Sequence, residues 1–307
     1  MPYKREGCDK RQCLYYFLSA TAMEEADGRI ILHVSDMVKS GIKDVLIRTV
    51  DTDVVVLAVS FFHKLHDQGL QTLWIKFGTG ANVKHYAAHD IAVGLGDEKA
   101  VALRGFHAFT GCDEVSFFAR KGKKTAFNSW SGFPEVTSAF YAISQPLQDL
   151  PDHLFEVLEK YTIRLYDTRT QATNVDSVRQ DLYDGTKSLA MGPTTKYALR
   201  QHCHRAALQA GHVWGQADVP NPSPIEHTKW GWRVGGTGRG DGCERLLPLW
   251  STLSPNERAL SHVRILLFNL VFQSVFGTAP ACSRARGHPS RLQIRHQRAI
   301  FTPNRCA

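Results

Sequence analysis

The chain has 307 residues, of which 43% are hydrophobic, and its 37 basic and 29 acidic side chains give a net charge of +8. This composition supplies enough apolar residues for a sizeable core and excludes a wholly disordered chain. Residues 255–307 contain eight arginines and one acid, so this segment carries +7 and the rest of the chain is close to neutral. The positive charge therefore hints at a polyanionic partner only for the end of the chain.

The seven cysteines are scattered and form no Cys-x-x-Cys pair. Such a set favours a reducing compartment over a disulfide framework, so we expect an intracellular protein, with the nucleus as a candidate location. The apolar run within residues 1–22 is brief for a signal peptide. We therefore interpret these residues as a short leader that precedes the folded core. The apolar stretch 263–276 is shorter than the ~20 residues of a membrane span, so no membrane association is expected.

In chain order, apolar spacing predicts a helix over 23–40, a buried strand over 44–50 and a second helix over 54–68. A second strand is expected over 72–77 and a third helix over 97–109. This alternation predicts an α/β fold with a parallel sheet flanked by helices.

The pattern changes after residue 133. Residues 150–166, 175–183 and 195–210 have helical spacing, 219–224 is a proline-rich turn segment, and 231–242 is glycine-rich and expected to be a loop. The expected organisation is therefore a core at 23–132, a helical extension at 133–218, a linker with a tryptophan-rich segment at 219–254, and a basic, irregular tail at 255–307.

Three groups of acids lie near the ends of the expected elements: Glu25 with Asp27, Asp51 with Asp53, and Asp113. Sites in open parallel sheets form beyond the carboxyl ends of strands, where Asp51 and Asp53 are expected. Neighbouring carboxylates repel unless a cation lies between them, and Mg²⁺ and Mn²⁺ prefer carboxylate oxygens. The acids therefore indicate a site for one or two divalent cations that could promote phosphodiester hydrolysis.

Two other interpretations stay open for these acids. Acids at helix starts stabilise the helix dipole, so Glu25 and Asp27 could serve that purpose, and Asp51 could be a helix N-cap. The order Asp51-Thr-Asp53-Val-Val after a strand also fits a haloacid-dehalogenase-like phosphohydrolase, in which Asp51 would be the nucleophile. His107 is expected to be a packed histidine.

A basic segment follows Asp113. We expect Phe117–Ala126 to form a helix, a glycine hairpin and a second helix, with Arg120, Lys121, Lys123 and Lys124 around Gly122. Backbone amides at a helix start bind phosphate, and lysines reinforce such contacts without recognising base sequence. This segment is the predicted nucleic-acid-binding element.

The order of these motifs resembles the flap-endonuclease (XPG-type) family of the PIN-like nucleases. The resemblance implies a metal centre of Glu25, Asp27, Asp51, Asp53 and Asp113, with Asp51, Asp53 and Asp113 also catalytic. It implies a helix–two-turn–helix around Gly122, binding of DNA in preference to RNA, and Mg²⁺ or Mn²⁺ as cofactor. The stretch from about 23 to 254 is also similar to uncharacterised animal proteins associated with mobile elements.

The sequence departs from the family pattern in one important respect. Flap endonucleases carry further metal-binding aspartates on an N-terminal strand, and residues 1–22 are too few to supply that strand and its helices. We therefore expect a truncated member. The resulting alternatives are a metal-dependent, structure-specific nuclease and a non-catalytic nucleic-acid-binding or interaction module of the same fold.

Overall fold

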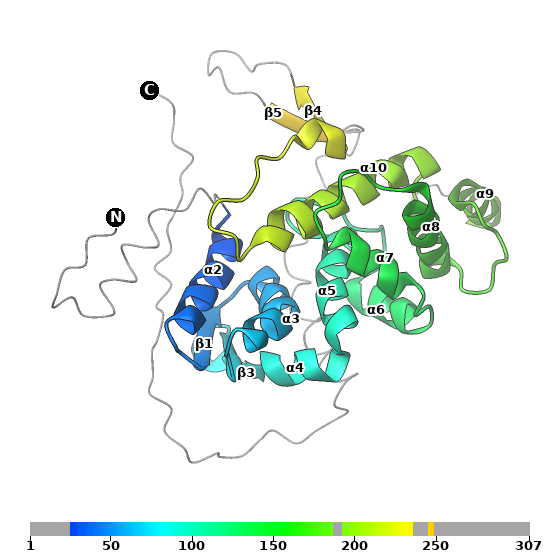
Figure 1. Cartoon of the computed structure of the whole chain (residues 1–307). Coiled ribbons are helices and arrows are strands. Elements are labelled where there is room, and N and C mark those ends of the chain that lie inside the picture. The colour runs from blue at the N-terminus through cyan, green and yellow to red at the C-terminus, as the bar shows by residue number, and fades with distance from the viewer. Residues whose placement is uncertain (1–24, 187–191, 236–244, 249–307) are drawn as a thin grey trace.

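The computed structural model describes residues 25–186, 192–235 and 245–248 (Figure 1). The leader at 1–22, Glu24 and the basic tail at 255–307 lie outside the described residues, so the predictions for them stay predictions. Within the described residues, no helix combines the length and apolar character that a membrane span requires.

A three-stranded mixed sheet has the order β1-β2-β3. Strands β1 (Asp44–Thr49) and β2 (Thr72–Phe77) are parallel, and β3 (Lys84–Ala87) is antiparallel to β2. The α/β fold class is thus confirmed, but the expectation of a purely parallel sheet is wrong. A 3₁₀ turn, Gly80–Asn82, lets the chain return after β2, and a crossover helix is unnecessary for an antiparallel neighbour.

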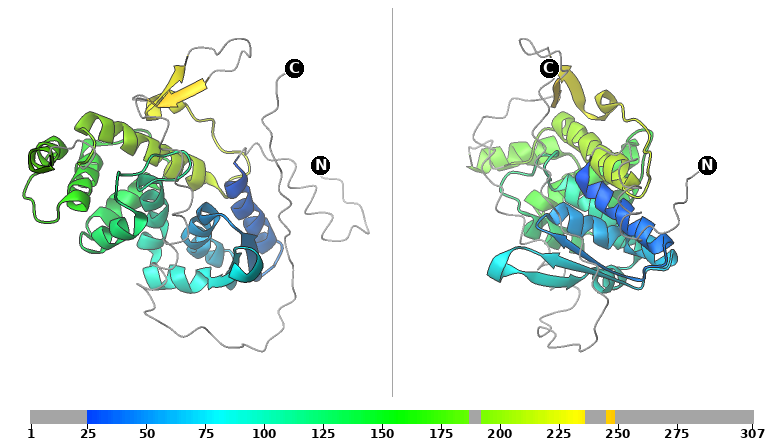
Figure 2. Two further views of the ribbon diagram at one scale, coloured as in Figure 1. Left: turned by 180° about the vertical axis from the view of Figure 1, so that it is seen from behind. Right: turned by 90° about the vertical axis from the view of Figure 1, so that its left-hand side faces the viewer.

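The sheet is apolar on one face. Val45, Ile47, Leu73 and Ile75 are buried, whereas Trp74 is 41% exposed. This alternation follows the two-residue period of a strand. Helices α2 (Ala26–Lys39), α3 (Thr52–Asp67), α4 (Ala88–Leu95) and α5 (Asp97–Phe109) accompany the sheet, and Figure 2 (right) shows the strands along the lower margin with helices above them.

Helix α3 lies at the centre of the α/β half of the described chain, which comprises the sheet and helices α2 to α5. Twelve residues of α3 are buried, including a run from Thr52 to Phe62. It packs between α2 and α5. The expected helices at 23–40, 54–68 and 97–109 and the strands at 44–50 and 72–77 are confirmed to within a few residues.

The second half is helical and contains α6 (Lys123–Ser131), α7 (Val136–Ile143), α8 (Asp152–Tyr166), α9 (Val175–Thr186) and α10 (Lys196–Ala207). It joins the first half through α5, which packs tightly on α7. A side chain on Gly105 would overlap the Phe140 carbonyl oxygen, so only glycine permits this approach. The buried Arg104 donates to the Ser144 carbonyl at 3.0 Å across the same interface.

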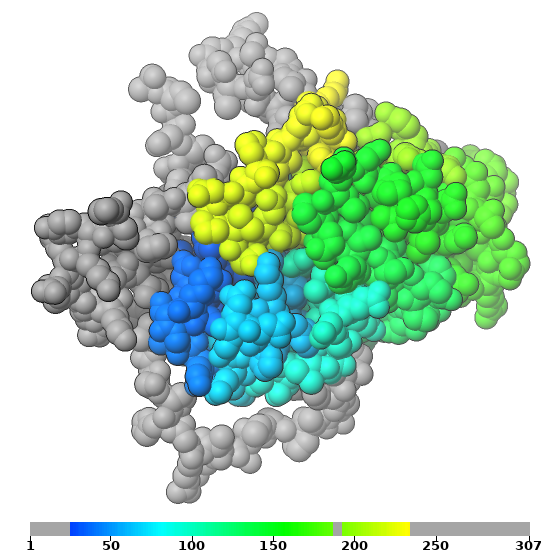
Figure 3. Space-filling view, in the orientation of Figure 1, coloured from blue at the N-terminus to red at the C-terminus, as the bar shows by residue number. Residues whose placement is uncertain are grey.

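The chain then turns back toward α2. A π-helix η3 (Leu208–Val213) continues α10 and leads into the 3₁₀ turns η4 (Trp214–Gln216) and η5 (His227–Trp230). Figure 3 shows this yellow segment lying against the blue α2 and the green helical half. Lys64 of α3 pairs with Asp218 at 2.6 Å, which fixes the segment to the α/β half.

Two local predictions are wrong. Residues 111–122 form an irregular connection between α5 and α6, so the helix expected near Phe117 is absent. Phe118 packs into the core, and Arg120 adopts a left-handed φ of 59°, which no helix accommodates. The loop expected at 231–242 is contradicted at its start, where Trp232–Gly235 forms β4, which pairs antiparallel with β5 (Arg245–Pro248). Residues 236–242 lie outside the described residues.

Candidate metal centre

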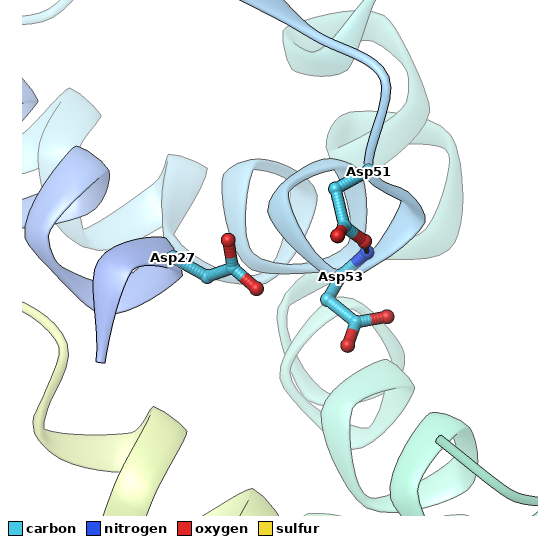
Figure 4. Close-up of side chains that lie close together, drawn as sticks. All are labelled: Asp27, Asp51 and Asp53. Carbon is cyan, nitrogen blue, oxygen red and sulfur yellow. Dashed lines mark hydrogen bonds between the residues drawn. The ribbon is translucent and has the colours of Figure 1, made fainter. Parts of the chain in front are cut away.

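Three aspartates from two segments meet at the carboxyl end of β1. Asp27 lies in the first turn of α2, Asp51 precedes α3 as its N-cap residue, and Asp53 lies in the first turn of α3. One carboxylate oxygen from each lies within 4.8 Å of the others. Figure 4 shows the Asp27 carboxylate directed toward Asp51 and Asp53 across the gap between the two helix starts.

The turn after β1 fixes the second pair of acids. The Asp51 amide donates to Thr49 Oγ1 at 2.9 Å, and the Asp53 amide donates to Asp51 Oδ1 at 3.0 Å. Asp51 is therefore a helix N-cap, as the structural interpretation of the sequence predicted. Capping does not exclude metal binding, because an ionised carboxylate has two oxygens and about four acceptor sites.

His107 of α5 forms a hydrogen bond with Asp53. The residue is 2% exposed, and Nε2 lies 2.9 Å from Asp53 Oδ1. Burial lowers the pKa of His107, and the nearby Lys123 lowers it further, while the bond to Asp53 opposes both effects. The neutral imidazole then donates from Nε2 to the carboxylate and fixes its orientation. In metal sites, outer-shell hydrogen bonds orient the coordinating side chains in the same way.

Glu25 lies at the N-cap of α2 but does not cap the helix through its side chain. Its Oε1 accepts hydrogen bonds from Gln209 Nε2 at 3.1 Å and Trp214 Nε1 at 3.0 Å. Its Oε2 is buried and has no hydrogen-bond partner among the described residues. Burial raises the pKa of Glu25 to about 7, and the negative charges of Asp27 and Asp53 add to this rise.

Lys123 is directed inward, not toward the surface. Its Nζ donates to the His107 carbonyl at 2.8 Å and to Thr110 Oγ1 at 3.0 Å. Burial lowers the pKa of this ammonium to about 8, against the opposing effects of Cys112 and Asp53. Lys123 is one of the residues predicted to bind nucleic acid, and in the structure its charged group bonds to the end of α5.

The remaining predicted residues lie apart from the three aspartates. Asp113 is exposed in the irregular 111–122 connection and does not belong to the group of three. Arg120, Gly122 and Lys124 are exposed, and Lys121 Nζ lies 5.0 Å from the centre of the Tyr166 ring. The three basic residues therefore lie in the irregular connection and the first turn of α6, and the expected helical hairpin is not formed.

The sequence interpretation missed the supporting residues His107, Gln209 and Trp214. His107 was correctly expected to be packed, but its bond to Asp53 was not foreseen. Gln209 and Trp214 lie 184 and 189 residues from Glu25 along the chain. No periodic pattern reports such a contact, because periodicity describes only the face on which a residue lies.

The donor set suits a hard divalent cation. Three carboxylates make up the group, and among the described residues no cysteine or imidazole belongs to it. Carboxylate oxygens are donors that hard cations prefer. The orphaned Oε2 of Glu25, buried in the same region, is a further oxygen that a cation or its water could satisfy. The structure thus shows an acidic cluster that could hold a metal ion.

Comparison with known proteins adds no further assignment: no protein-family model, curated protein or solved structure matches this chain.

Proposed function

We propose that Asp27, Asp51 and Asp53 bind Mg²⁺ or Mn²⁺ and that the chain is a PIN-like, flap-endonuclease-like protein that acts on phosphodiesters in DNA or RNA. The observation that carries the proposal is the meeting of three carboxylates, from segments 24 to 26 residues apart in sequence, within 4.8 Å. Repulsion makes such a meeting costly without a cation. A bound divalent cation would stabilise the negative charge that develops on a phosphodiester under attack by water.

The protein residues around the cluster have distinct roles in this proposal. His107 holds Asp53 in place through the 2.9 Å bond. Glu25, with a pKa raised to about 7 by burial, can exchange a proton at Oε2 near neutral pH, which suits a general base. The exposed Arg120 and Lys124, with the partly exposed Lys121, would contact the phosphate backbone without selecting a base sequence.

The proposal is tested with the double variant Asp51→Asn/Asp53→Asn. Asparagine keeps the Oδ1 atoms that accept from the Asp53 amide and from His107, so the fold should persist while two ligand charges are lost. Mn²⁺ affinity, measured by titration calorimetry, should fall on the order of 100-fold. Asp181→Asn, an exposed acid on α9, is the matched control and should leave Mn²⁺ affinity unchanged.

The same proteins are incubated with single-stranded, duplex and flapped DNA and with RNA, in Mn²⁺ and in EDTA. Mn²⁺-dependent cleavage that the double variant loses supports the nuclease. Mn²⁺ binding without any cleavage supports the non-catalytic module instead. Wild-type protein that binds no Mn²⁺ would refute the metal site, and a covalent phosphate on Asp51 would support the haloacid-dehalogenase alternative.

A further inference from the structure

The face of the β1-β2-β3 sheet that points away from the core carries an exposed aromatic ring. Helices cover the other face (Figure 2, right), where alternate strand residues such as Ile47 and Ile75 are buried. The residues between them point outward, because side chains alternate along a strand. Leu46 and Trp74 are in register in the middle of this outward face, and Trp74 is 41% exposed. A large apolar ring is thus presented to solvent on a regular, flat support.

Two residues further along β1 and β2, three basic side chains form a row across the strands. Arg48 is in register with Lys76, and Lys76 with His85 of β3. Arg48 and His85 are exposed and Lys76 is partly exposed. Within the described part of the chain, none of the three has an ion-pair partner. Neighbouring strands lie ~4.8 Å apart, so the row concentrates like charges that an anion would neutralise.

The only acid in these three strands lies far from the basic row. Asp44 begins β1, four residues before Arg48, and accepts a hydrogen bond from Thr72 at 2.7 Å. Four residues of an extended strand span ~13 Å, so Asp44 does not neutralise the row. The outward face is therefore basic at the carboxyl ends of β1 and β2 and apolar in its middle.

The spacing of the ring and the basic row suits a nucleotide. Two residues along a strand span ~6.6 Å, so a base stacked on Trp74 would direct its phosphate toward the row. Exposed aromatic rings on sheets bind unpaired bases by stacking, and basic side chains beside them bind the phosphates. The Trp74 ring also contacts His89, with ring centroids 5.2 Å apart. This contact fixes the indole before a base arrives.

Other occupants fit the charge of this face less well. Residues 255–307 carry +7, so the basic row would repel them. A second copy of the chain would bring its own basic row against this one. A single-stranded nucleic acid supplies both the negative charge and the free base faces. It would also lead to the proposed metal site, because Arg48 is only three residues before Asp51.

We propose that the outward face of the sheet binds single-stranded nucleic acid, with an unpaired base stacked on Trp74 and phosphates bound by Arg48, Lys76 and His85. Bases inside a duplex stack on each other and offer no free face to the indole. The inference deepens the proposed function by naming an unpaired segment as the substrate. It rests on that function only for the step from binding to cleavage, so binding is tested in EDTA.

The first experiment measures fluorescence anisotropy of labelled oligothymidylate and oligouridylate with the full chain in EDTA. Trp74→Leu keeps an apolar side chain and removes the ring, and we expect affinity to fall about tenfold, a usual loss for one stacking ring. Trp74→Phe keeps a ring and should stay within about threefold of the wild type. Tyr197→Leu removes an aromatic ring that is 63% exposed on α10 and should change affinity less than twofold.

The second experiment removes two charges from the basic row. We expect Arg48→Gln/Lys76→Gln to lower affinity for the single strands on the order of tenfold. The slope of log affinity against log salt should fall in magnitude by about 1.4, since each phosphate contact to a single strand contributes ~0.7. The matched control is Lys160→Gln/Arg169→Gln, which removes the same charge from exposed positions in the helical half. This control should keep the wild-type slope.

Three further measurements can overturn the inference. A hairpin duplex with closed ends should lose little affinity on Trp74→Leu, and a loss equal to that of the single strands would exclude stacking. Unchanged affinity of the folded charge variant would mean that the row only protects the edge of β1 from pairing with other chains. Trp74-dependent binding to phosphatidylserine vesicles, without binding to oligonucleotides, would assign the face to a membrane surface instead.

The outcomes separate this inference from the proposed function. Melting temperatures show which variants fold, and if Trp74→Leu does not fold, Trp74→Phe and the charge variant still decide the question. A wild-type chain that binds no single strand in EDTA would refute the sheet surface, whereas its Mn²⁺ binding would still decide the metal site. A chain that binds single strands but no Mn²⁺ would keep the sheet surface and lose the metal site.

Discussion

Glu25 illustrates how the environment of one side chain changes its chemistry. Burial, with Asp27 and Asp53 nearby, raises its pKa to about 7 from 4.5, although Trp214 and Gln209 donate hydrogen bonds that favour the ionised form. Near neutral pH the side chain is thus divided between its neutral and charged forms. A cation in the site would favour the charged form, so metal binding and proton release at Glu25 are linked.

Stability in EDTA should depend on pH through Glu25. Because the folded-state pKa is raised, the contribution of Glu25 is fully present below about pH 4.5 and is lost as the pH rises through about 7. Relative to Glu25→Gln, the wild type should lose about 2 kcal/mol of unfolding free energy between about pH 5 and pH 8, a value reduced because Glu25 is not completely buried. Urea unfolding at several pH values measures this difference.

Glutamine is the suitable replacement because its Oε1 still accepts from Trp214 and Gln209. Taking the difference between two proteins removes the effect of the buried histidines, whose lowered pKa values act in the opposite direction. A difference that stays constant over the pH range would mean that Glu25 is not perturbed.

At the scale of elements, the π-helix η3 connects the helical half with the acidic cluster. Such bulges are often found at functional sites, where they redirect side chains. Here Gly211 lies so close to the Gln145 carbonyl that a side chain would overlap it, and the chain continues directly into Trp214. Gln209 and Trp214 thereby reach Glu25 at the start of α2.

Replacing Trp214 with Phe should therefore weaken metal binding. Phenylalanine keeps a buried ring but removes the Nε1–H that donates to Glu25, which favours the protonated acid. We expect Mn²⁺ affinity at pH 7 to fall about threefold to tenfold, because the substitution removes an outer-shell hydrogen bond and leaves the coordinating aspartates in place. Trp230→Phe makes the same replacement at a buried tryptophan in the neighbouring turn η5 and should leave Mn²⁺ affinity unchanged. Equal effects of the two variants would show that only packing is involved.

At the scale of the whole molecule, positive charge and the acidic cluster lie on different segments. The acids lie at the starts of α2 and α3, whereas Arg120 and Lys121 lie in the connection between α5 and α6 and Lys124 lies in the first turn of α6. Substitutions in the basic residues can therefore be tested separately from substitutions in the acidic cluster.

Nucleic-acid binding should consequently be insensitive to EDTA and sensitive to salt. We expect Lys121→Ala/Lys124→Ala to lower affinity for DNA of any sequence by about tenfold and to reduce the slope of affinity against salt concentration. Lys39→Ala/Lys43→Ala removes the same charge from the exposed end of α2 and the turn after it, and should have little effect. Fluorescence anisotropy at several salt concentrations measures both. Equal losses in the two variants would indicate a general effect of net charge.

The sequence by itself determined the order and type of the elements that contain the cluster. Helical spacing and a short β-branched run located α2, β1, α3, β2 and α5, because burying one face imposes a fixed period on apolar residues. The same reasoning placed Asp51 and Asp53 beyond a strand and Asp27 at a helix start. It missed the antiparallel β3 and the β4–β5 hairpin, since these short strands are held by pairing across the sheet, and not by a local preference.

Only the tertiary structure decided which of the candidate residues meet. It brought Asp27 to Asp51 and Asp53, left Asp113 outside that group, and turned Lys123 from the expected surface to the end of α5. It also supplied His107, Gln209 and Trp214 as supporting donors. These outcomes depend on how the helices pack and on where buried polar groups find hydrogen-bond partners. Both involve residues far apart in the chain, so no local stretch of sequence predicts them.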